Sequence, residues 1–113
     1  MVTQPPERKA DADYSLTRVH ELALRESVHY AGTRVQVDVA NLGYGLEEVC
    51  ACLSSLRPID FSHSERYTPR GVWHDVYKLS WGLPGRAPDD LYVKFRMDDD
   101  VLVIELCSFH QHR

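Results

Sequence analysis

Histidines supply most of the proton-transfer capacity of this chain. Four of its six histidines lie in the second half, at His63, His74, His110 and His112. Imidazole titrates near neutral pH and can therefore both accept and donate a proton. RNA carries its own nucleophile, the 2′-hydroxyl, so a base, an acid and a cation on the phosphate suffice to cut it without a metal. These histidines predict acid–base chemistry, although a single surface histidine is more often only polar surface.

Residues 91–97 alternate strictly between apolar and polar side chains. The apolar members are Leu91, Val93, Phe95 and Met97, and the polar members are Tyr92, Lys94 and Arg96. In a strand this period places the two sets on opposite faces. If the apolar set faces a core, the phenol and the two cations share an open face, which suits phosphate binding. The alternative is an ordinary solvated face with long side chains.

Other chemistries find less support in the sequence. The six glycines are scattered and form no phosphate loop. His110 and His112 lack a third ligand at a suitable spacing, so we expect no metal and no cofactor. Cys107 and His110 would point to opposite faces of a strand, which argues against a thiol nucleophile. The three cysteines are an odd count without framework spacing and are expected to be reduced.

Composition predicts one ordinary globular domain. The 113 residues are 43% hydrophobic and 27% charged. The formal net charge of -4 argues mildly against nucleic-acid binding, so any basic footprint must be local. No apolar run approaches the length of a membrane span. Residues 1–13 contain Pro5 and Pro6 and no apolar signal-peptide core, so we expect a disordered leader, a domain over 14–113 and a cytoplasmic location.

The first half of the chain reads mainly as helices. Ser15 is a suitable N-cap for a helix that runs to about Glu26. Residues 28–31 are expected to form a short extended segment that ends at Gly32. Alternating valines in residues 33–42 favour a strand, but Thr33 as a cap and Gly43 as a stop favour a helix, which we expect. Residues 45–56 carry one apolar stripe and predict a third helix.

The second half reads as strands. Residues 61–67 show no helical pattern, and residues 72–79 are rich in strand-forming side chains. Glycines and prolines in residues 81–90 predict a loop. Residues 91–97 and 101–109 flank the acidic turn Asp98 to Asp100 and therefore predict a hairpin. Helices followed by strands predict an α+β fold in which N-terminal helices pack on a small antiparallel sheet.

Several short sequence segments, in this order along the chain, resemble those of MqsR toxins. They are Tyr14-Ser15-Leu16, Leu42-Gly43-Tyr44, Asp60-Phe61, Val72-Trp73-His74-Asp75-Val76-Tyr77, Leu91-Tyr92-Val93-Lys94-Phe95, Asp100-Val101-Leu102-Val103-Ile104 and Ser108-Phe109-His110. The resemblance covers nearly everything after the leader. It implies a RelE-like α+β fold, an RNase that cuts mRNA without needing the ribosome, and a DNA-binding cognate antitoxin encoded nearby.

The expected site residues match the usual residues of the family at some positions and differ from them at others. Tyr92 matches an active-face tyrosine of the family. His63 stands where the family usually has lysine, and His74 stands where it usually has glutamine. His110 follows Ser108-Phe109 where the family has lysine. The segment 64–67 is one residue shorter than the family pattern. All three replacements introduce histidine, which implies that imidazole groups do more of the acid–base work here.

The leading hypothesis is a metal-independent endoribonuclease, an mRNA interferase that leaves a 2′,3′-cyclic phosphate or 3′-phosphate and a 5′-hydroxyl. The catalytic candidates are His63, His74, Tyr92 and His110, and the RNA-binding candidates are Arg66, Lys94 and Arg96. The sequence does not decide which histidine is the acid and which the base. One alternative is a non-catalytic protein of the toxin fold that binds an antitoxin or RNA. A second is a toxin with another target, such as tRNA or ribosome-bound mRNA.

Overall fold

The computed structural model describes residues 5–98 and 100–112. Its elements in chain order are β1 (Glu7–Lys9), α1 (Leu16–Leu24), β2 (Val28–Tyr30), α2 (Thr33–Asn41), α3 (Leu46–Ser54), the 3-10 turn η1 (Pro58–Asp60), β3 (Phe61–Arg66), β4 (His74–Trp81), β5 (Asp89–Asp98) and β6 (Val103–Gln111). Helices dominate the first half and long strands the second, so the fold is mixed α+β.

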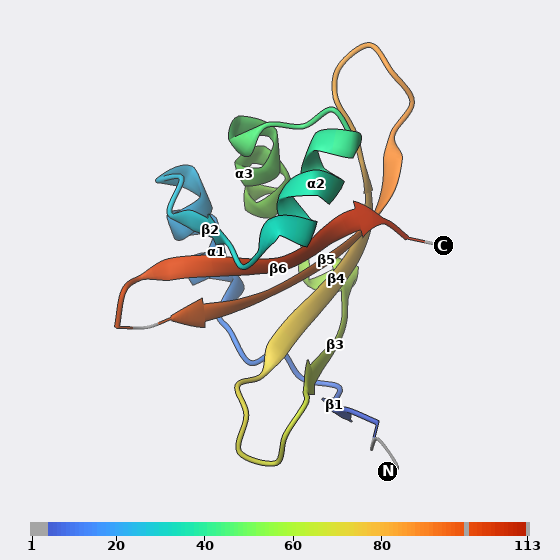
Figure 1. Ribbon diagram of the computed structural model, residues 1–113. Coiled ribbons are helices and arrows are strands. Elements are labelled where there is room, and N and C mark those ends of the chain that lie inside the picture. The colour runs from blue at the N-terminus through green and yellow to red at the C-terminus, as the bar shows by residue number, and fades with distance from the viewer. Residues whose placement is uncertain (1–4, 99, 113) are drawn as a thin grey trace.

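The strands form one six-stranded sheet in the order β1-β3-β4-β5-β6-β2. Four of the five neighbouring pairs are antiparallel. The fifth pair, β2 with β6, is parallel, so the expectation of an antiparallel sheet was wrong at this edge. The chain enters β2 straight after α1 and runs in the same direction as the final strand. Two short N-terminal strands therefore form the two opposite edges of the sheet (Figure 1).

β1 lies inside the segment that was expected to be a disordered leader. It pairs with β3, and the ammonium of Lys9 lies 4.4 Å from the centre of the Trp73 ring. The backbone N–H groups of Asp13 and Tyr14 donate to the buried carboxylate of Asp75 at 3.0 Å. The leader prediction was therefore wrong for this part, and residues 1–4 lie outside the described residues. Edge pairing uses backbone groups, so the polar composition did not reveal it.

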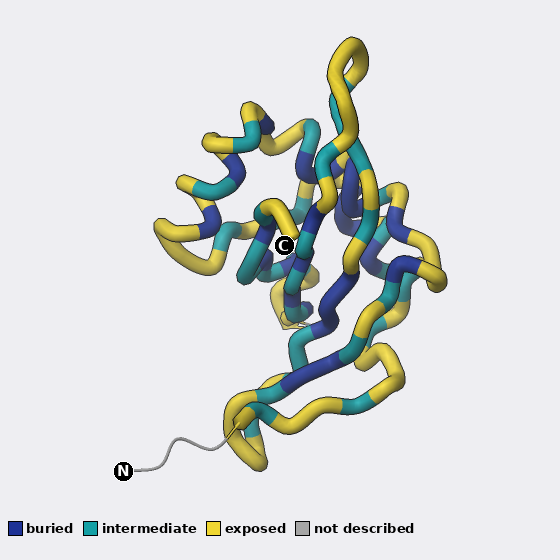
Figure 2. The backbone as a smooth tube through the Cα atoms, turned by 90° about the vertical axis from the view of Figure 1, so that its right-hand side faces the viewer, coloured by how far each residue is buried: buried dark blue, intermediate teal, exposed yellow. Residues whose placement is uncertain are grey.

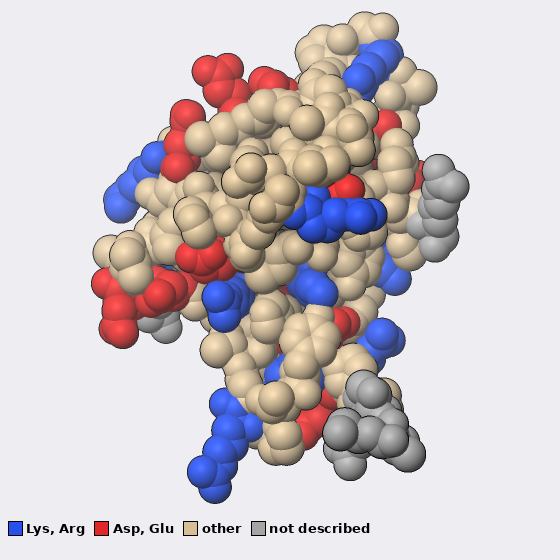
Figure 3. Space-filling model, viewed as in Figure 1, with Lys and Arg blue, Asp and Glu red and all other residues tan. Residues whose placement is uncertain are grey.

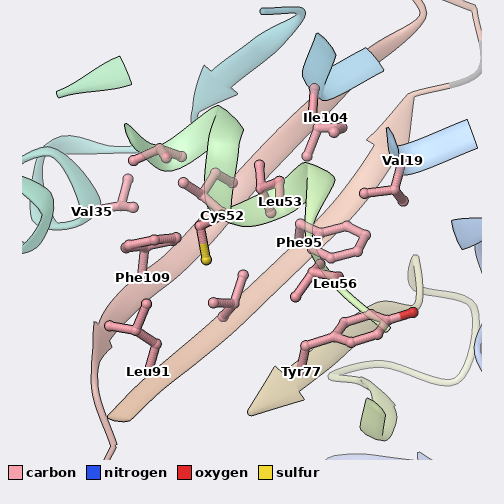
Figure 4. Close-up of a cluster of buried hydrophobic side chains, with 14 of the residues drawn as sticks. Val19, Val35, Cys52, Leu53, Leu56, Tyr77, Leu91, Phe95, Ile104 and Phe109 are labelled. Carbon is pink, nitrogen blue, oxygen red and sulfur yellow. The ribbon is translucent and has the colours of Figure 1, made fainter. Parts of the chain in front are cut away.

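One hydrophobic cluster joins the three helices to one face of the sheet. Its fully buried members include Val19, Leu22, Val49, Leu53, Tyr77, Val93, Phe95, Ile104, Leu106 and Phe109. Figure 4 shows side chains of α3 such as Cys52 and Leu53 among Phe95 and Phe109 of the strands. In Figure 1 the helices lie above the β5 and β6 ribbons. The apolar set of β5 thus faces the helices, as the alternation of residues 91–97 predicted.

Two helix ends lie at the residues that the sequence predicted, but the start of α2 does not: its N-cap is Gly32 and not Thr33, and no side chain caps it. The Ser15 hydroxyl accepts a hydrogen bond from the Arg18 N–H at 3.3 Å, which confirms the N-cap of α1. Residues Thr33–Asn41 are helical as expected, with Val35 and Val39 buried four positions apart. Gly43 adopts a φ of 79° just after this helix, a left-handed conformation that favours glycine at a helix C-terminus.

Exposed loops separate the long strands. β4 and β5 are joined by residues 82–88, and Figure 2 shows this loop projecting away from the body with its backbone coloured as largely exposed. The loop was expected from its glycines and prolines, although β4 extends one residue and β5 two residues into the expected range 81–90. The longest ladder of the sheet joins β5 to β6, and β5 pairs with β4 on its other side.

Candidate functional site

The face of the sheet opposite the helices carries most of the predicted site residues. On β5 the residues Tyr92, Lys94 and Arg96 are half-buried and alternate with the fully buried core set. Cross-strand register extends this face to both sides, because Val76 pairs with His63 and with Lys94, and Tyr92 pairs with His110. Among the described residues, no helix covers this face, which we call the open face. It is accessible to a large ligand.

A chain of hydrogen bonds crosses the open face from β5 to β3. The ammonium of Lys94 donates to the hydroxyl of Tyr67. The Tyr67 hydroxyl donates to Oε2 of Glu65 at 2.7 Å, and Nε2 of His63 lies 2.7 Å from Oε1 of the same carboxylate. Lys94 Nζ also lies 3.9 Å from Glu65 Oε2. An imidazole, a phenol and a cation are thus held together by one buried carboxylate.

Glu65 is the ionised centre of this chain. Only 5% of the surface of Glu65 is exposed to solvent. Burial acts to raise the pKa of Glu65, but the hydrogen bonds from Tyr67 and His63 and the charge of Lys94 outweigh it, and the pKa lies below its ordinary value. Burial and the bond to Glu65 raise the pKa of Tyr67, which therefore stays a phenol. The negative charge of Glu65 is consequently balanced by the Lys94 ammonium and stabilised by hydrogen bonds with Tyr67 and His63.

His74 stands beside this chain at the start of β4. Its ring centre lies 5.2 Å from that of Tyr67, and it pairs in register with Glu65. Its Nδ1 atom is buried and has no hydrogen-bond partner among the described residues. Burial, together with the charge of Lys94, lowers the pKa of His74 below its ordinary value. His74 is therefore neutral near pH 7. It can form a hydrogen bond with a phosphate but does not carry a positive charge.

This lowered pKa makes stability depend on pH in a defined direction. Between the folded pKa of His74 and the unfolded value of about 6.5, the unfolded chain binds more protons, so the free energy of unfolding rises with pH. The contribution is complete above the unfolded pKa and is lost as pH falls through the folded one. In His74→Gln, which never titrates, we expect a smaller loss of stability between roughly pH 7 and pH 5. Urea denaturation of both proteins at several pH values measures this; equal slopes would contradict it.

A second group of rings lies at the other side of the open face. Tyr92 stacks on His110 with ring centres 5.1 Å apart, and on His112 at 6.1 Å. Nδ1 of His110 lies 2.8 Å from the carbonyl oxygen of Gln111. A carbonyl only accepts, so this nitrogen carries the proton and Nε2 of His110 is left to exchange protons with a ligand. Burial raises the pKa of Tyr92, so it too remains a phenol.

The two groups are separated by the width of three strand spacings. His63 is on β3 and His110 is on β6, so their backbones are roughly 14 Å apart. Lys94 lies between them on β5. A phosphate bound over Lys94 would therefore have His63 on one side and the Tyr92–His110 pair on the other. In-line displacement needs the attacking and the leaving oxygen on opposite sides of phosphorus in this manner.

Arg66 is not part of the open face. Alternation along β3 turns it to the same side as Ser64, away from Glu65. Its guanidinium makes an ion pair with Glu7 at 2.8 Å and lies 4.6 Å from the centre of the Trp73 ring. The structure thus separates Arg66 from Lys94 and Arg96, with which it was grouped. Arg96 does lie on the open face, opposite Glu105 of β6.

Sequence reasoning missed Ser62, Glu65 and Tyr67. Glu65 follows His63 by two residues, so strand alternation alone places both side chains on one face. That signal was available in the sequence. Tyr67 lies beyond the end of β3, and its approach to Lys94 depends on the path of the following loop. No pattern in the sequence specifies that path.

Charge is unevenly distributed over the surface. Figure 3 shows acidic side chains gathered at the left of the view, around the turn between β5 and β6. Asp98, Asp100 and Glu105 line a depression there together with Arg96. The net charge of -4 is therefore partly local and does not prevent a cationic centre at Lys94. In the part of the chain that the structure describes, no helix has the length and apolar character needed to cross a bilayer.

Comparison with known proteins agrees with the resemblance noted from the sequence. No curated protein matches the chain. A family model described as "Motility quorum-sensing regulator, toxin of MqsA" matches residues 11–111. The match includes α1 and every element of the open face, from β3 through β6, and omits β1. Because it spans nearly the whole chain, the protein belongs to the MqsR family of toxins.

Proposed function

We propose that the protein is a metal-independent endoribonuclease that cuts mRNA, with a RelE-like fold, as the toxin of a toxin–antitoxin pair. The observation that carries the proposal is the arrangement on the open face: Lys94 at its centre, His63 on one side and Tyr92 with His110 on the other. The family supports the toxin role, and its description names MqsA as the antitoxin. A cognate antitoxin of the MqsA kind would then neutralise the protein.

The proposed reaction uses the 2′-hydroxyl of the RNA. His63 takes the 2′-hydroxyl proton while the 2′-oxygen bonds to phosphorus. The bond from phosphorus to the 5′-oxygen then breaks, and His110 protonates that oxygen. Lys94 and Arg96 hold the phosphate, Tyr92 orients it, and His74 contacts it as a neutral group. The products are a 2′,3′-cyclic phosphate and a 5′-hydroxyl. Acid–base help of this kind contributes roughly 100- to 10,000-fold in rate, and the cation adds stabilisation of the transition state.

The test is incubation of purified, antitoxin-free protein with a long mRNA in EDTA, followed by mapping of the new ends. We expect cuts at specific sites that carry 5′-hydroxyls. Intact RNA from a demonstrably folded sample would favour a non-catalytic protein that binds RNA or an antitoxin. Cutting only in the presence of ribosomes would favour a ribosome-dependent toxin. Because the site draws on two imidazoles, the rate should also show a bell-shaped dependence on pH.

A further inference from the structure

Both ring nitrogens of His63 have a hydrogen-bond partner. Nε2 lies 2.7 Å from Oε1 of Glu65, and Nδ1 lies 2.9 Å from the hydroxyl oxygen of Ser62. The two partners differ in what they can do. A carboxylate only accepts hydrogen bonds, whereas a hydroxyl can donate or accept. The identity of the partners therefore decides where the ring proton lies.

Glu65 forces the proton of neutral His63 onto Nε2. The second oxygen of Glu65 accepts from the Tyr67 hydroxyl and faces the Lys94 ammonium, so the group is surrounded by donors and stays ionised. Nε2 must then be the donor in its short contact with Glu65. A neutral imidazole has one N–H, so Nδ1 carries the free lone pair. Nδ1 is thus the atom of His63 that can take a proton.

A β-bulge brings the Ser62 hydroxyl to this lone pair. Neighbouring residues of a regular strand point to opposite faces, so Ser62 and His63 would not normally touch. The register of β3 with β4 shifts between Phe61 and His63, which makes Ser62 the extra residue. Bulges re-aim side chains in this way and are common next to active sites. Ser62 is exposed, so a ligand can reach the same position.

We propose that Glu65 is a positioning residue that holds His63 in its Nε2–H form. Nδ1 of His63 then receives the proton of the attacking 2′-hydroxyl, which binds at the position that the Ser62 hydroxyl occupies in this structure. This inference rests on the proposed ribonuclease function and adds the reacting atom. The 2′-oxygen loses its proton to Nδ1 as it bonds to phosphorus. Glu65 stays ionised throughout and stabilises the imidazolium that forms. The proton that the 5′-oxygen gains comes from the acid on the other side of the phosphate.

The test combines nitrogen-15 NMR of the histidine rings with RNA cleavage kinetics on the full chain. In the wild-type protein, above the titration of the ring, we expect His63 to show only the Nε2–H form. Glu65→Leu removes the acceptor and should give a mixture of both forms, with kcat lowered about 100-fold and KM little changed. Glu65→Gln keeps an acceptor oxygen but no charge, so the Nε2–H form should persist with a smaller loss of kcat. Glu21→Gln, on the exposed face of α1, removes a carboxylate outside the open face and should change neither the ring form nor the rate.

Each outcome separates this inference from the ribonuclease proposal. A wild-type ring with its proton on Nδ1 would overturn the role of Glu65 even if the protein cuts RNA. An unchanged ring form and rate in Glu65→Leu would do the same. If Glu65→Leu fails to fold, the wild-type spectrum and Glu65→Gln still decide the matter. The wild-type protein could also show the expected ring form and yet not cut RNA. That result would support the positioning of His63 by Glu65 and would count against the ribonuclease function.

Discussion

Alanine in place of His63 is expected to lower the rate of RNA cleavage by about 100- to 10,000-fold, the usual contribution of a positioned base. The substitution removes the imidazole that is hydrogen-bonded to the Glu65 carboxylate. The carboxylate keeps its bonds to Tyr67 and its ion pair with Lys94, so the fold should survive. Single-turnover cleavage of a defined RNA, with enzyme in excess, measures the chemical step directly.

His29→Ala is the matched control for this prediction. His29 lies on the edge strand β2 and pairs with Glu105 at 2.8 Å, four strand positions away from β3. Its loss removes an exposed imidazole from the same sheet but should leave cleavage unchanged. If His63→Ala cut RNA as fast as the wild type, the base would have to be another group and the assignment of the site would be wrong.

Phe95→Ala is expected to lower the free energy of unfolding by about 3–5 kcal/mol, the typical cost of deleting a buried aromatic ring. Phe95 is completely buried, and its ring stacks on that of Tyr77 with centres 5.7 Å apart. It also lies in β5, whose other face carries Lys94. Since domains are stable by only about 5–15 kcal/mol, this loss removes much of the total. Urea denaturation followed by circular dichroism measures it.

Ile59→Ala provides the comparison for the core substitution. Ile59 is 80% exposed in η1, so removing its side chain should change stability by no more than about 0.5 kcal/mol. A similar small effect of Phe95→Ala would mean that the helices and the sheet do not share one tightly packed core. Amide hydrogen exchange on β5 would then show weak protection along the strand.

The sequence predicted most of the fold because its strongest patterns follow from burial. The alternation in residues 91–97 fixed both a strand and its two faces, since one face had to meet the helices. The α2 segment was harder, because alternating valines mimic a strand. Its helix is decided by the burial of Val35 and Val39, with Val37 left 47% exposed. The pairing of β1 with β3, and of β2 with β6, depends on backbone contacts between segments far apart in the sequence, which side-chain patterns do not encode.

The sequence predicted which residues lie on the open face better than it predicted their arrangement on it. The four predicted catalytic residues, His63, His74, Tyr92 and His110, all lie on the open face. Their division into two groups across Lys94 depends on the strand order, which the sequence does not state. Arg66 was predicted to share this face, but alternation along β3 turns its side chain to the other side, with Ser64. The link from Lys94 to Tyr67 requires a loop path that only the three-dimensional structure supplies.

The position of the two short strands at opposite edges bears on how the chain is made. β2 pairs with residues that follow it by about 76 positions, and the contact between Arg66 and Glu7 spans 59. A chain emerging from the ribosome therefore has its first thirty residues ready long before their partners exist. Sequence-distant pairings of this kind slow folding. The sheet can close at β2 only when the last strand has been synthesised, so a nascent or prematurely ended chain lacks His110 and the β2–β6 seam together.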